Sequence, residues 1–402
     1  MKNRALFFRL FALVTAMMCT LGASAAEAYA NYTPSDSTLT FYYDDLRSTR
    51  TGTTYDANDW PNWYSDGTNA NVTKVVFDST FANARPTGTN HWFHGMVNLE
   101  SITGITYLNT SEVTDMNMMF TGCKKLASLD LSHFNTAKVT DMSKMFRNCN
   151  LLTSLNVSSF NTAQVTTMEA MFEDCCVLTS LDLSNFNTSK VTNMRAMFNI
   201  CEALTSLNVS HFNTSQVTTM ESMFEDCRVL TSLDVSSFNT ANVTYVQRMF
   251  SSCKSLTSLD LSSFNTSKVA EMWWMFMNCP QLETIYVGDG WSTAAVVNSF
   301  NMFLLCTSLV GGQGTTYDAS HVDAAYAHID GGTSNPGYFT EKPIGLLGDL
   351  NGDGLVNVTD VTMLITMAMN ETGNDNAAAD LNGDGIINVT DVTMLITLAL
   401  NN

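Results

Sequence analysis

One phrase returns at a fixed interval along more than half of this chain. Each copy carries the pair Met-Phe, followed three residues later by Cys, and imperfect copies lie at Phe93 and Phe303. A fixed period of 26 positions, as from Phe120 to Phe146, predicts a solenoid, because one repeat cannot cover its own apolar side chains and must stack on its neighbours. The regular copies place their phenylalanines at Phe120, Phe146, Phe172, Phe198, Phe224, Phe250 and Phe276.

The two halves of the repeat have different rhythms, as in 152–175, LTSLNVSSFNTAQVTTMEAMFEDC. The first half buries alternate residues, which predicts a short strand, and the second has apolar residues at helical spacing. Thr166 and Glu169, like Thr218 and Glu221, have the spacing of a capping box that begins a helix. We therefore expect an α/β repeat solenoid with one strand and one short helix in each coil, and with the strands paired in a parallel sheet.

Stacking turns each repeat position into a column of side chains. One column holds Asn directly after a Phe, and buried amides there are expected to bond the turn backbones of adjacent coils. This reading makes the column a structural ladder. Its members are Asn135, Asn161, Asn187, Asn213, Asn239 and Asn265.

Cysteine forms a second column. Export would normally favour disulfides, but nine cysteines remain after Cys19, and an odd number at one inward position per coil favours reduced, buried thiols. Metal binding is not expected, because no His accompanies the column. The column consists of Cys123, Cys149, Cys175, Cys201, Cys227, Cys253, Cys279 and Cys306, with Cys176 as an extra residue.

The outward strand positions form a polar face, which is either simply solvated or a surface for a protein or glycan ligand. It combines a Ser column with a column in which Asp and Asn mix and so reduce repulsion between stacked carboxylates. Trp273 and Trp274, where other coils have polar or small residues, either cap the last coil or stack on a ligand. The two columns are Ser128, Ser154, Ser180, Ser206, Ser232 and Ser258, and Asp130, Asn156, Asp182, Asn208, Asp234 and Asp260.

The repeat, summarised as LTSLDLSSFNTSKVTxMxxMFxxC, resembles the BspA-type leucine-rich-repeat surface proteins of host-associated bacteria. The resemblance covers about 93–310, with an N-terminal cap at 31–92 and a C-terminal cap and linker at 311–342. It implies a leucine-rich-repeat-like fold, exposure at the cell surface and binding, often as an adhesin toward a host protein or another microbe. It names no particular ligand.

The first thirty residues have the pattern of a secretory signal peptide. Lys2, Arg4 and Arg9 precede an apolar run, and small residues then allow cleavage after Ala25 or Ala30. No later stretch has the roughly 18 apolar residues of a transmembrane segment, so we expect a secreted protein, extracellular or at the cell surface. Acidic residues outnumber basic ones by 38 to 19, which argues against nucleic acid or an anionic membrane as partner.

Residues 343–402 contain no Lys or Arg, and they carry one acidic phrase twice, DLNGDG followed by NVTD, beginning at Asp349 and again at Asp380. Hard oxygen ligands at loop positions 1, 3, 5, 7, 9 and 12 are the pattern that wraps Ca²⁺, and two copies predict two ions. The ligands expected are Asp349, Asn351, Asp353, the Leu355 carbonyl, Asn357 and Asp360, then Asp380, Asn382, Asp384, the Ile386 carbonyl, Asn388 and Asp391.

An apolar helix follows each loop, but no comparable helix precedes it, and position 12 is Asp where an EF-hand has Glu. The segment instead resembles a type I dockerin, a small all-α calcium-binding domain. This resemblance implies docking to a cohesin-domain protein, in either of two orientations because the halves are nearly identical. It assigns partner contacts to Val358, Thr359, Thr366, Met367, Val389, Thr390, Thr397 and Leu398.

No catalytic constellation stands out, since the repeats offer the same groups in every coil and glycoside hydrolysis needs two carboxylates in unlike environments. The sequence therefore favours an exported, non-catalytic binding protein docked to a cohesin. The alternative is a component of a cellulosome-like assembly that degrades polysaccharides, because dockerins commonly carry such enzymes.

Overall fold

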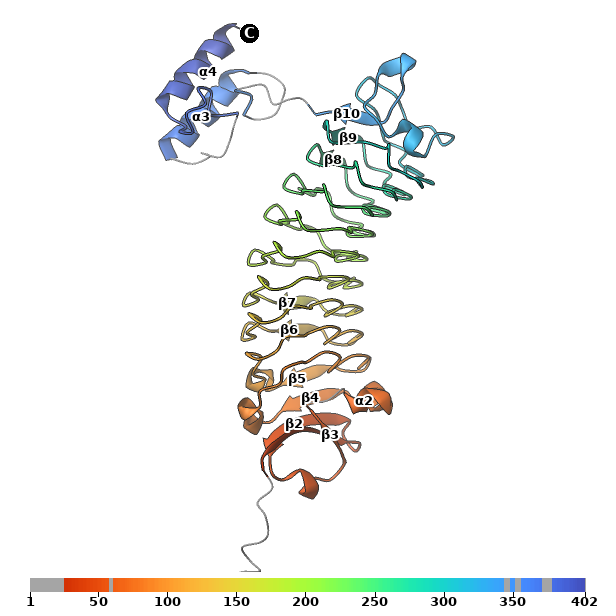
Figure 1. The fold of residues 1–402 in the computed structure, drawn as a ribbon, viewed down its shortest axis with the longest axis vertical. Helices are drawn as coiled ribbons and strands as arrows, with labels where there is room; N and C mark the ends of the chain where they lie inside the picture. The colour runs from red at the N-terminus through yellow and green to blue at the C-terminus, as the bar shows by residue number, and fades with distance from the viewer. Residues whose placement is uncertain (1–24, 58–60, 343–347, 351–355, 371–377, 402) are drawn as a thin grey trace, which may run out of the picture. The chain divides into compact units, whose positions relative to one another are not determined.

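The computed structural model describes residues 25–57, 61–342, 348–350, 356–370 and 378–401 (Figure 1). The chain divides into two compact units, Met1–Thr340 and Glu341–Asn402. The predicted signal peptide lies largely outside the described residues. Each unit is taken separately below.

The first unit begins with a five-stranded sheet in the order β3-β1-β2-β4-β5. The pairs β1–β2 and β1–β3 are antiparallel, whereas β2–β4 and β4–β5 are parallel, so the sheet changes from a hairpin into the parallel stacking of the coils. The strands are β1 (Glu27–Thr33), β2 (Thr38–Asp44), β3 (Thr53–Asp56), β4 (Lys74–Phe77) and β5 (Ser101–Thr103). Short helices join them: η1 (Arg47–Thr49), α2 (Asn62–Ser65), η2 (Thr68–Asn71), η3 (Ser79–Asn83) and η4 (Ile105–Tyr107).

An aromatic cluster covers the first coil. Phe41 stacks on Trp92 at 5.1 Å between ring centroids, and Trp63 donates its indole N–H to the Trp92 carbonyl at 2.8 Å. Trp63 and Trp92 are buried, as expected for a cap, and Trp60 lies outside the described residues. Residues 28–30 are buried in β1, so a cap beginning at residue 31 would lose the first half of this strand.

The coils stack in register, one repeat above the next (Figure 1). Short strands pair in parallel, β6 with β7 and β8 with β9, and each residue lies opposite the equivalent residue of the next repeat. Phe120, Phe146 and Phe172 lie in a continuous column of parallel rings with centroids 5.7 Å apart. These strands are β6 (Ser128–Asp130), β7 (Ser154–Asn156), β8 (Ser258–Leu261) and β9 (Thr284–Val287).

The predicted helix in each coil is wrong, because the described residues of the coils form turns in its place. Ala170 and Asp174 have φ of 52° and 60°, which a right-handed helix does not allow, and the same two positions are left-handed in coil after coil. The Phe172 amide donates to the Met197 carbonyl of the next coil at 3.0 Å, whereas the Met171 amide donates three residues back at 3.2 Å. Alternate amides thus bond between and within coils.

The distance between coils explains this correction. An α-helix with its side chains is about 10–12 Å wide, which cannot fit into coils whose stacked Phe rings are 5.7 Å apart. Thr166 accordingly donates its hydroxyl to the Thr140 carbonyl of the preceding coil at 3.1 Å and does not cap a helix. Turns repeating every three to four residues bury the same side chains that a helix would bury.

The Asn column is not the buried ladder that the sequence suggests. Asn161 is exposed, and its side-chain Oδ1 accepts the Ala163 amide at 3.1 Å within its own turn. The ladder belongs to the next residue: the buried Thr162 hydroxyl donates to the Asn187 carbonyl at 2.9 Å and accepts the Asn187 amide at 2.7 Å. The buried threonines are Thr110, Thr136, Thr162, Thr188, Thr214, Thr240 and Thr266.

The eight column cysteines are buried free thiols. Each Sγ contacts a Phe carbonyl of the preceding coil, as Cys175 does with Phe146 at 3.3 Å and Cys306 with Phe276 at 2.9 Å. Burial raises the pKa of Cys149 and of Cys306 to about 12. Neutral thiols therefore act here as small apolar side chains that also satisfy a carbonyl.

The C-terminal end of the first unit is closed by β10 (Phe339–Glu341), which adds to β8 and β9, and by η5 (Ala324–Tyr326) and η6 (Gly332–Ser334). Phe303, in the last imperfect repeat, packs edge-on against Tyr338 and Phe339 at 5.2 and 5.8 Å. Asp330 is buried and accepts the Gln313 and Thr315 amides at 2.8 and 3.0 Å. This carboxylate fastens the terminal loops together.

The described residues of the second unit form two helices, α3 (Val358–Asn370) and α4 (Val389–Asn401), which pack against one another. Each starts within an Asn-Val-Thr-Asp sequence, so Val358 and Val389 hold equivalent places in the two copies. Their shared core is small and is made of Val356, Leu364, Ala379, Leu381, Ile387 and Leu395.

Candidate metal centre and binding surfaces

The second acidic loop folds around Asp380. Its Oδ1 accepts the Gly383 and Asp384 amides at 2.8 and 3.1 Å, and its Oδ2 accepts the Gly385 amide at 2.8 Å. Gly383 and Gly385 have φ of 74° and 81°, which glycine adopts without strain, so the chain can turn back on the carboxylate. The local sequence DLNGDG therefore produces a tight, oxygen-rich loop.

The next two expected ligands are held by similar bonds. The Asn382 Oδ1 accepts the Asp384 amide at 2.8 Å, and the Asp384 Oδ1 accepts the Ile386 amide at 2.8 Å. The Asn388 side chain donates to the Ile386 carbonyl at 3.1 Å. Five of the expected oxygen ligands thus lie within one short loop.

Asp391, at position 12, is fully buried where α4 begins. Its Oδ1 accepts the Leu381 amide at 3.0 Å and its Oδ2 accepts the Asn388 amide at 2.9 Å. In the first copy Asp360 is equally buried, and it accepts the Leu350 and Asn357 amides at 2.8 and 2.9 Å. Both aspartates join the end of a loop to the positive N-terminal end of a helix.

The donor set suits calcium, although the described carboxylates are not gathered into a cluster. No three His, Cys, Asp or Glu side chains among the described residues lie where they could hold one ion together. The loop nevertheless supplies hard oxygen atoms of the kind and spacing that Ca²⁺ takes, with lone pairs beyond those that accept amides. Of the first loop's ligands, Asp349, Asn357 and Asp360 are described, and Asn351, Asp353 and Leu355 lie outside the described residues.

The partner contacts assigned by resemblance are mostly at the surface. Val358 and Val389, the first residues of the two helices, are each 75% exposed, although both are apolar. Thr359, Thr366, Thr390, Thr397 and Leu398 are also exposed, whereas Met367 is half-buried against the small core. Met369 and Leu400 were missed by sequence reasoning and are the most exposed apolar residues of α3 and α4, at 79% and 81%.

The polar strand face of the first unit is exposed as expected. The Asp130 Oδ1 accepts the Ser132 amide at 3.0 Å, and this bond holds the pKa of Asp130 below its usual value. Asn156 makes the equivalent bond to the Ser158 amide at 3.1 Å. The column therefore shapes the turn after each strand, while most of its side chains stay exposed to solvent.

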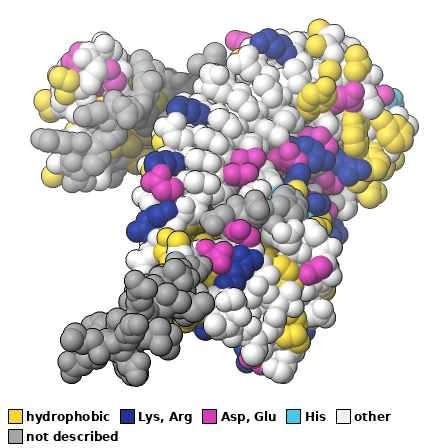
Figure 2. All heavy atoms as spheres, turned by 60° about the horizontal axis from the view of Figure 1, so that its bottom comes forward, with side chains coloured by type: hydrophobic (Ala, Val, Ile, Leu, Met, Phe, Trp, Pro, Cys, Tyr) yellow, Lys and Arg dark blue, Asp and Glu magenta, His cyan; other side chains and the backbone are white. Residues whose placement is uncertain are grey.

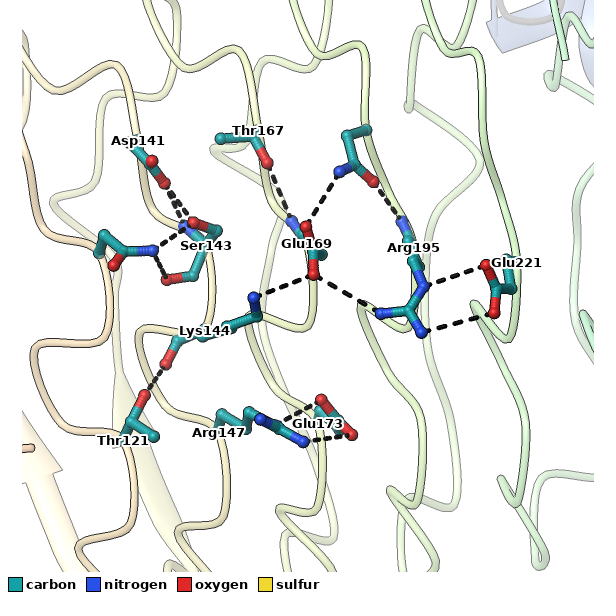
Figure 3. Close-up of polar contacts among 12 residues, drawn as sticks. Thr121, Asp141, Ser143, Lys144, Arg147, Thr167, Glu169, Glu173, Arg195 and Glu221 are labelled. Atoms are coloured by element: carbon teal, nitrogen blue, oxygen red, sulfur yellow. Dashed lines mark hydrogen bonds and ion pairs between the residues drawn. The ribbon is translucent and has the colours of Figure 1, made fainter. Parts of the chain in front are cut away.

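A ladder of ion pairs runs across successive coils at the turn positions and was not foreseen from the sequence. Figure 3 shows Lys144 reaching Glu169, and Arg195 placed between Glu169 and Glu221. The shortest distances are 3.1 Å for Lys144 to Glu169 and 3.0 Å for Arg195 to Glu221. Arg147 pairs in the same way with Glu173 at 2.7 Å. The signal was present in the sequence, since position 169 and its equivalents read Glu, Arg and Glu in three consecutive repeats.

The ladder lines a shallow pocket of about 240 Å³ that extends to Arg248. The coil after Arg248 holds Trp273 and Trp274, both half-buried, and the Arg248 guanidinium lies 4.8 and 4.4 Å from their ring centroids. The pair thus packs on its neighbouring coil and also keeps some exposed ring surface. Figure 2 shows one face of the molecule, on which basic and acidic side chains lie close together and hydrophobic side chains form separate groups.

No helix among the described residues combines the length and the apolar character needed to cross a membrane. A search of curated proteins found no match to the chain.

Solved structures with similarity to the chain include three leucine-rich proteins. A leucine-rich repeat protein from Bacteroides ovatus ATCC 8483 is 18% identical, with 71% of this chain and 92% of that chain covered and a TM-score of 0.22. One from Eubacterium ventriosum ATCC 27560 is 14% identical, with coverages of 82% and 98% and a TM-score of 0.26. A leucine rich cell surface protein from Faecalibacterium prausnitzii A2-165 is 17% identical, with coverages of 69% and 93% and a TM-score of 0.27.

Two family profiles match the sequence itself. The first, described as "Mycoplasma protein of unknown function, DUF285", matches residues 87–205, 176–286 and 257–335, which together span more than half of the chain. The second, "Dockerin type I domain", matches residues 347–398. Type I dockerins are docking modules and not catalytic domains. The chain therefore belongs to the DUF285 family of BspA-type leucine-rich-repeat proteins and carries a type I dockerin domain.

Proposed function

We propose that this protein is an exported, non-catalytic surface protein that a calcium-dependent dockerin attaches to a cohesin-bearing partner. The repeat array is the part that is carried, and it presents its exposed faces to a protein or glycan ligand. The observation that carries the proposal is the duplicated loop and helix, in which the buried Asp360 and Asp391 occupy equivalent places.

Calcium has a clear role in this proposal. Residues 343–402 carry eight acidic and no basic residues, so their carboxylates repel one another. Two bound ions would supply the missing positive charge. Within the chain, Asp380, Asn382, Asp384, the Ile386 carbonyl, Asn388 and Asp391 would hold one ion, and the equivalent residues of the first loop would hold the other.

The docking surface in this proposal consists of the exposed residues at the start and along the sides of α3 and α4. An apolar side chain that is 75% exposed, such as Val358 or Val389, leaves surface in water that a partner would cover. The two helices carry equivalent residues at equivalent places, so either can face the cohesin. The proposed dockerin extends over 343–402, after the cap and linker at 311–342.

Secretion would follow removal of the signal peptide. The structure of the N-terminal sheet favours cleavage after Ala25 over cleavage after Ala30, because the second would remove buried residues of β1. N-terminal sequencing of the mature protein tests this choice.

The docking proposal is tested with the full-length protein and an immobilised type I cohesin, by biolayer interferometry in excess calcium and then in chelator. We expect binding that chelator reverses and that Asp349→Ala combined with Asp380→Ala abolishes. Asp182→Ala, on the exposed strand face of the first unit, is the matched control and should bind normally. Binding that persists in chelator would refute the role of calcium.

The docking face is tested separately. Val358→Asp or Val389→Asp alone should leave cohesin binding within a few fold, because the other helix remains available, whereas the double substitution should abolish binding. Full binding by the double variant would place the docking face elsewhere.

The alternative is that the protein is a component of a polysaccharide-degrading assembly, which the dockerin favours because such domains commonly carry glycoside hydrolases. In that case the purified protein would release reducing sugar from a polysaccharide panel, and a single carboxylate substitution would abolish the release. The absence of any release, with cohesin binding intact, would support the non-catalytic proposal.

A further inference from the structure

Four aromatic residues lie at turn positions of three successive coils near the end of the array. We call Tyr245, Trp273, Trp274 and Phe300 the aromatic patch. Backbone pairing places them in neighbouring coils, because Tyr245 bridges Glu271 and the Trp274 amide donates to the Phe300 carbonyl at 3.1 Å. Phe300 is 62% exposed and Tyr245 47%, so this patch leaves ring surface in water.

The patch is not simply an apolar surface, because polar groups lie among its rings. Gln247 occupies the repeat position of Glu221 and Trp273, in the coil between them. It is only 6% exposed, and its Oε1 has no hydrogen-bond partner within the described residues. The Trp274 indole N–H is likewise buried, and the described structure offers it no acceptor. The patch thus holds one unsatisfied acceptor and one unsatisfied donor.

Arg248 is the cation closest to these rings. Its guanidinium stacks on both tryptophans, and its ion pair with Glu225, at 3.7 Å, is longer than the earlier pairs of the ladder, which lie between 2.7 and 3.6 Å. The Arg248 Nε also lacks a hydrogen-bond partner among the described residues. Arg248, which has the longest ion pair of the ladder, is thus the residue at which the ladder meets the aromatic patch.

We infer that the aromatic patch binds a neutral glycan, an inference that rests on the proposed function of the array as a ligand-presenting surface. A sugar ring has an apolar face that stacks on an aromatic ring, and hydroxyls that can both donate to Gln247 and accept from Trp274 or Arg248. A purely apolar protein contact would offer those groups no hydrogen-bond partner. The net charge of −19, and Glu221, Glu225 and Glu271 nearby, disfavour an anionic glycan.

The test uses the full-length, calcium-loaded protein and isothermal titration with linear hexasaccharides of glucose, mannose and xylose, with hexagalacturonate as the anionic comparison. We expect at least one neutral hexasaccharide to bind and to change the tryptophan fluorescence. Trp273→Ala should weaken this binding about tenfold, equivalent to about 1.4 kcal/mol. Trp273→Phe, which keeps a ring for stacking, should recover part of the affinity.

Two controls separate a binding role from a structural one. Tyr107→Ala removes an exposed tyrosine at the other end of the array and should leave glycan binding unchanged. Because Trp273 also packs on Arg248, the thermal melt and cohesin binding of Trp273→Ala are compared with those of the unsubstituted protein. Phe300→Ala, at the most exposed ring of the patch, should also weaken binding and is the second variant if Trp273→Ala melts early.

Four outcomes would overturn the inference. The first is that no neutral hexasaccharide binds while cohesin still does, which leaves the docking proposal intact. The second is that glycan binding is unaffected in both Trp273→Ala and Phe300→Ala, and the third is that hexagalacturonate binds more tightly than the neutral sugars. The fourth is that sedimentation shows self-association that Trp273→Ala removes. In the last case the occupant of the patch is a second copy of this chain.

Discussion

At the scale of single residues, neighbouring positions of one repeat have opposite roles. Asn161 turns the chain locally at the surface, and the adjacent Thr162 bonds two coils together from a buried position. An amide group has more hydrogen-bonding capacity than a hydroxyl, which favours Asn in a ladder when composition alone is considered. The narrow interior accepts the smaller side chain, whose single oxygen both donates to and accepts from the same residue of the next coil.

Replacing the Thr162 hydroxyl gives the first prediction. Thr162→Val keeps the shape of the side chain but leaves the Asn187 amide without its acceptor, so the free energy of unfolding should fall by about 1–3 kcal/mol. Asn161→Ala, one residue earlier, removes an exposed turn bond and should cost less than about 1 kcal/mol. Urea unfolding of both variants makes the comparison. A larger loss of unfolding free energy for Asn161→Ala than for Thr162→Val would instead support the Asn column as the ladder between coils.

Asp330 gives a prediction about pH. Burial tends to raise the pKa of Asp330, but the amides and hydroxyl that it accepts, from Thr315, Gly332 and Gln313, outweigh burial and lower this pKa well below its usual value. A carboxyl group whose pKa is lower in the folded state contributes stability at pH values above its unfolded pKa, about 3.9. That contribution is lost as the pH falls through the folded pKa.

Asp330→Asn should therefore destabilise the end of the array by about 1–3 kcal/mol at pH 7, and the difference should shrink steadily as the pH falls below about 4. Urea unfolding at pH 7 and at stepwise lower pH measures this difference in stability between Asp330→Asn and the unsubstituted protein. Asp289→Asn, at an exposed aspartate after β9, serves as the comparison for general surface charge. A difference that does not change with pH would show that the ionised carboxylate is not what holds the loops.

At the scale of elements, the sequence predicts the strands and the buried residues of each coil but not the conformation of the second half. Val165, Met168 and Phe172 are buried in either case, because successive tight turns advance the chain by three or four residues just as a helix does. Sequence periodicity reports burial and cannot distinguish these conformations. The first left-handed position, at Ala170, has no consistent sequence signature, since Lys, Ala, Ser, Arg and Trp all occupy it. The second, at Asp174, is Gly, Asn or Asp in five of the eight coils from Gly122 to Leu305, which are residues that favour this conformation.

A substitution at the second left-handed position distinguishes turns from a helix. Ile200 has φ of 58°, a conformation that costs an L-residue about 1–2 kcal/mol and glycine almost nothing. Ile200→Gly should therefore change the free energy of unfolding little, because the relief of this strain offsets the greater freedom of the unfolded chain and the lost contacts of a half-buried side chain. In a helix the same change would cost about 0.5 kcal/mol.

Ser189→Gly provides the matched control in the same repeat. Ser189 is exposed and is not left-handed, so glycine there should cost about 0.5–1 kcal/mol through the greater freedom of the unfolded chain. Equal losses in Ile200→Gly and Ser189→Gly would contradict the turn conformation.

The sequence predicts the parts of the candidate site that are local in the chain, and it does not predict the parts that join adjacent repeats. The acidic loops are local patterns, so their ligand positions can be read directly from the order of residues. The ion-pair ladder and the aromatic patch join residues of adjacent repeats, and they become visible only when it is known which turn positions face outward. Glu169, Arg195 and Glu221 are the clearest example, since each looks like an ordinary surface charge in its own repeat.

At the scale of the whole molecule, the two units differ in what should stabilise them. The first has a continuous core of stacked rings and apolar side chains, whereas the described residues of the second have a core of six buried residues, in a segment whose sequence is strongly acidic. Calcium should therefore stabilise only the second unit, since a ligand stabilises the state that binds it.

Differential scanning calorimetry tests this expectation. In excess calcium we expect two transitions, and chelator should lower the midpoint of only the smaller one, or abolish it. With Asp349→Ala and Asp380→Ala together, calcium should no longer move the smaller transition. A shift of the larger transition by calcium would show that the array also binds the ion.

The close spacing of the stacked rings has a consequence for how such a protein can evolve. Every coil presents the same backbone edges to both neighbours, so an in-frame duplication or loss of one repeat in the gene would lengthen or shorten the array by one layer. Both capping ends and the dockerin would be left as they were. The reach of the displayed surface can thus change in discrete steps while its attachment stays the same.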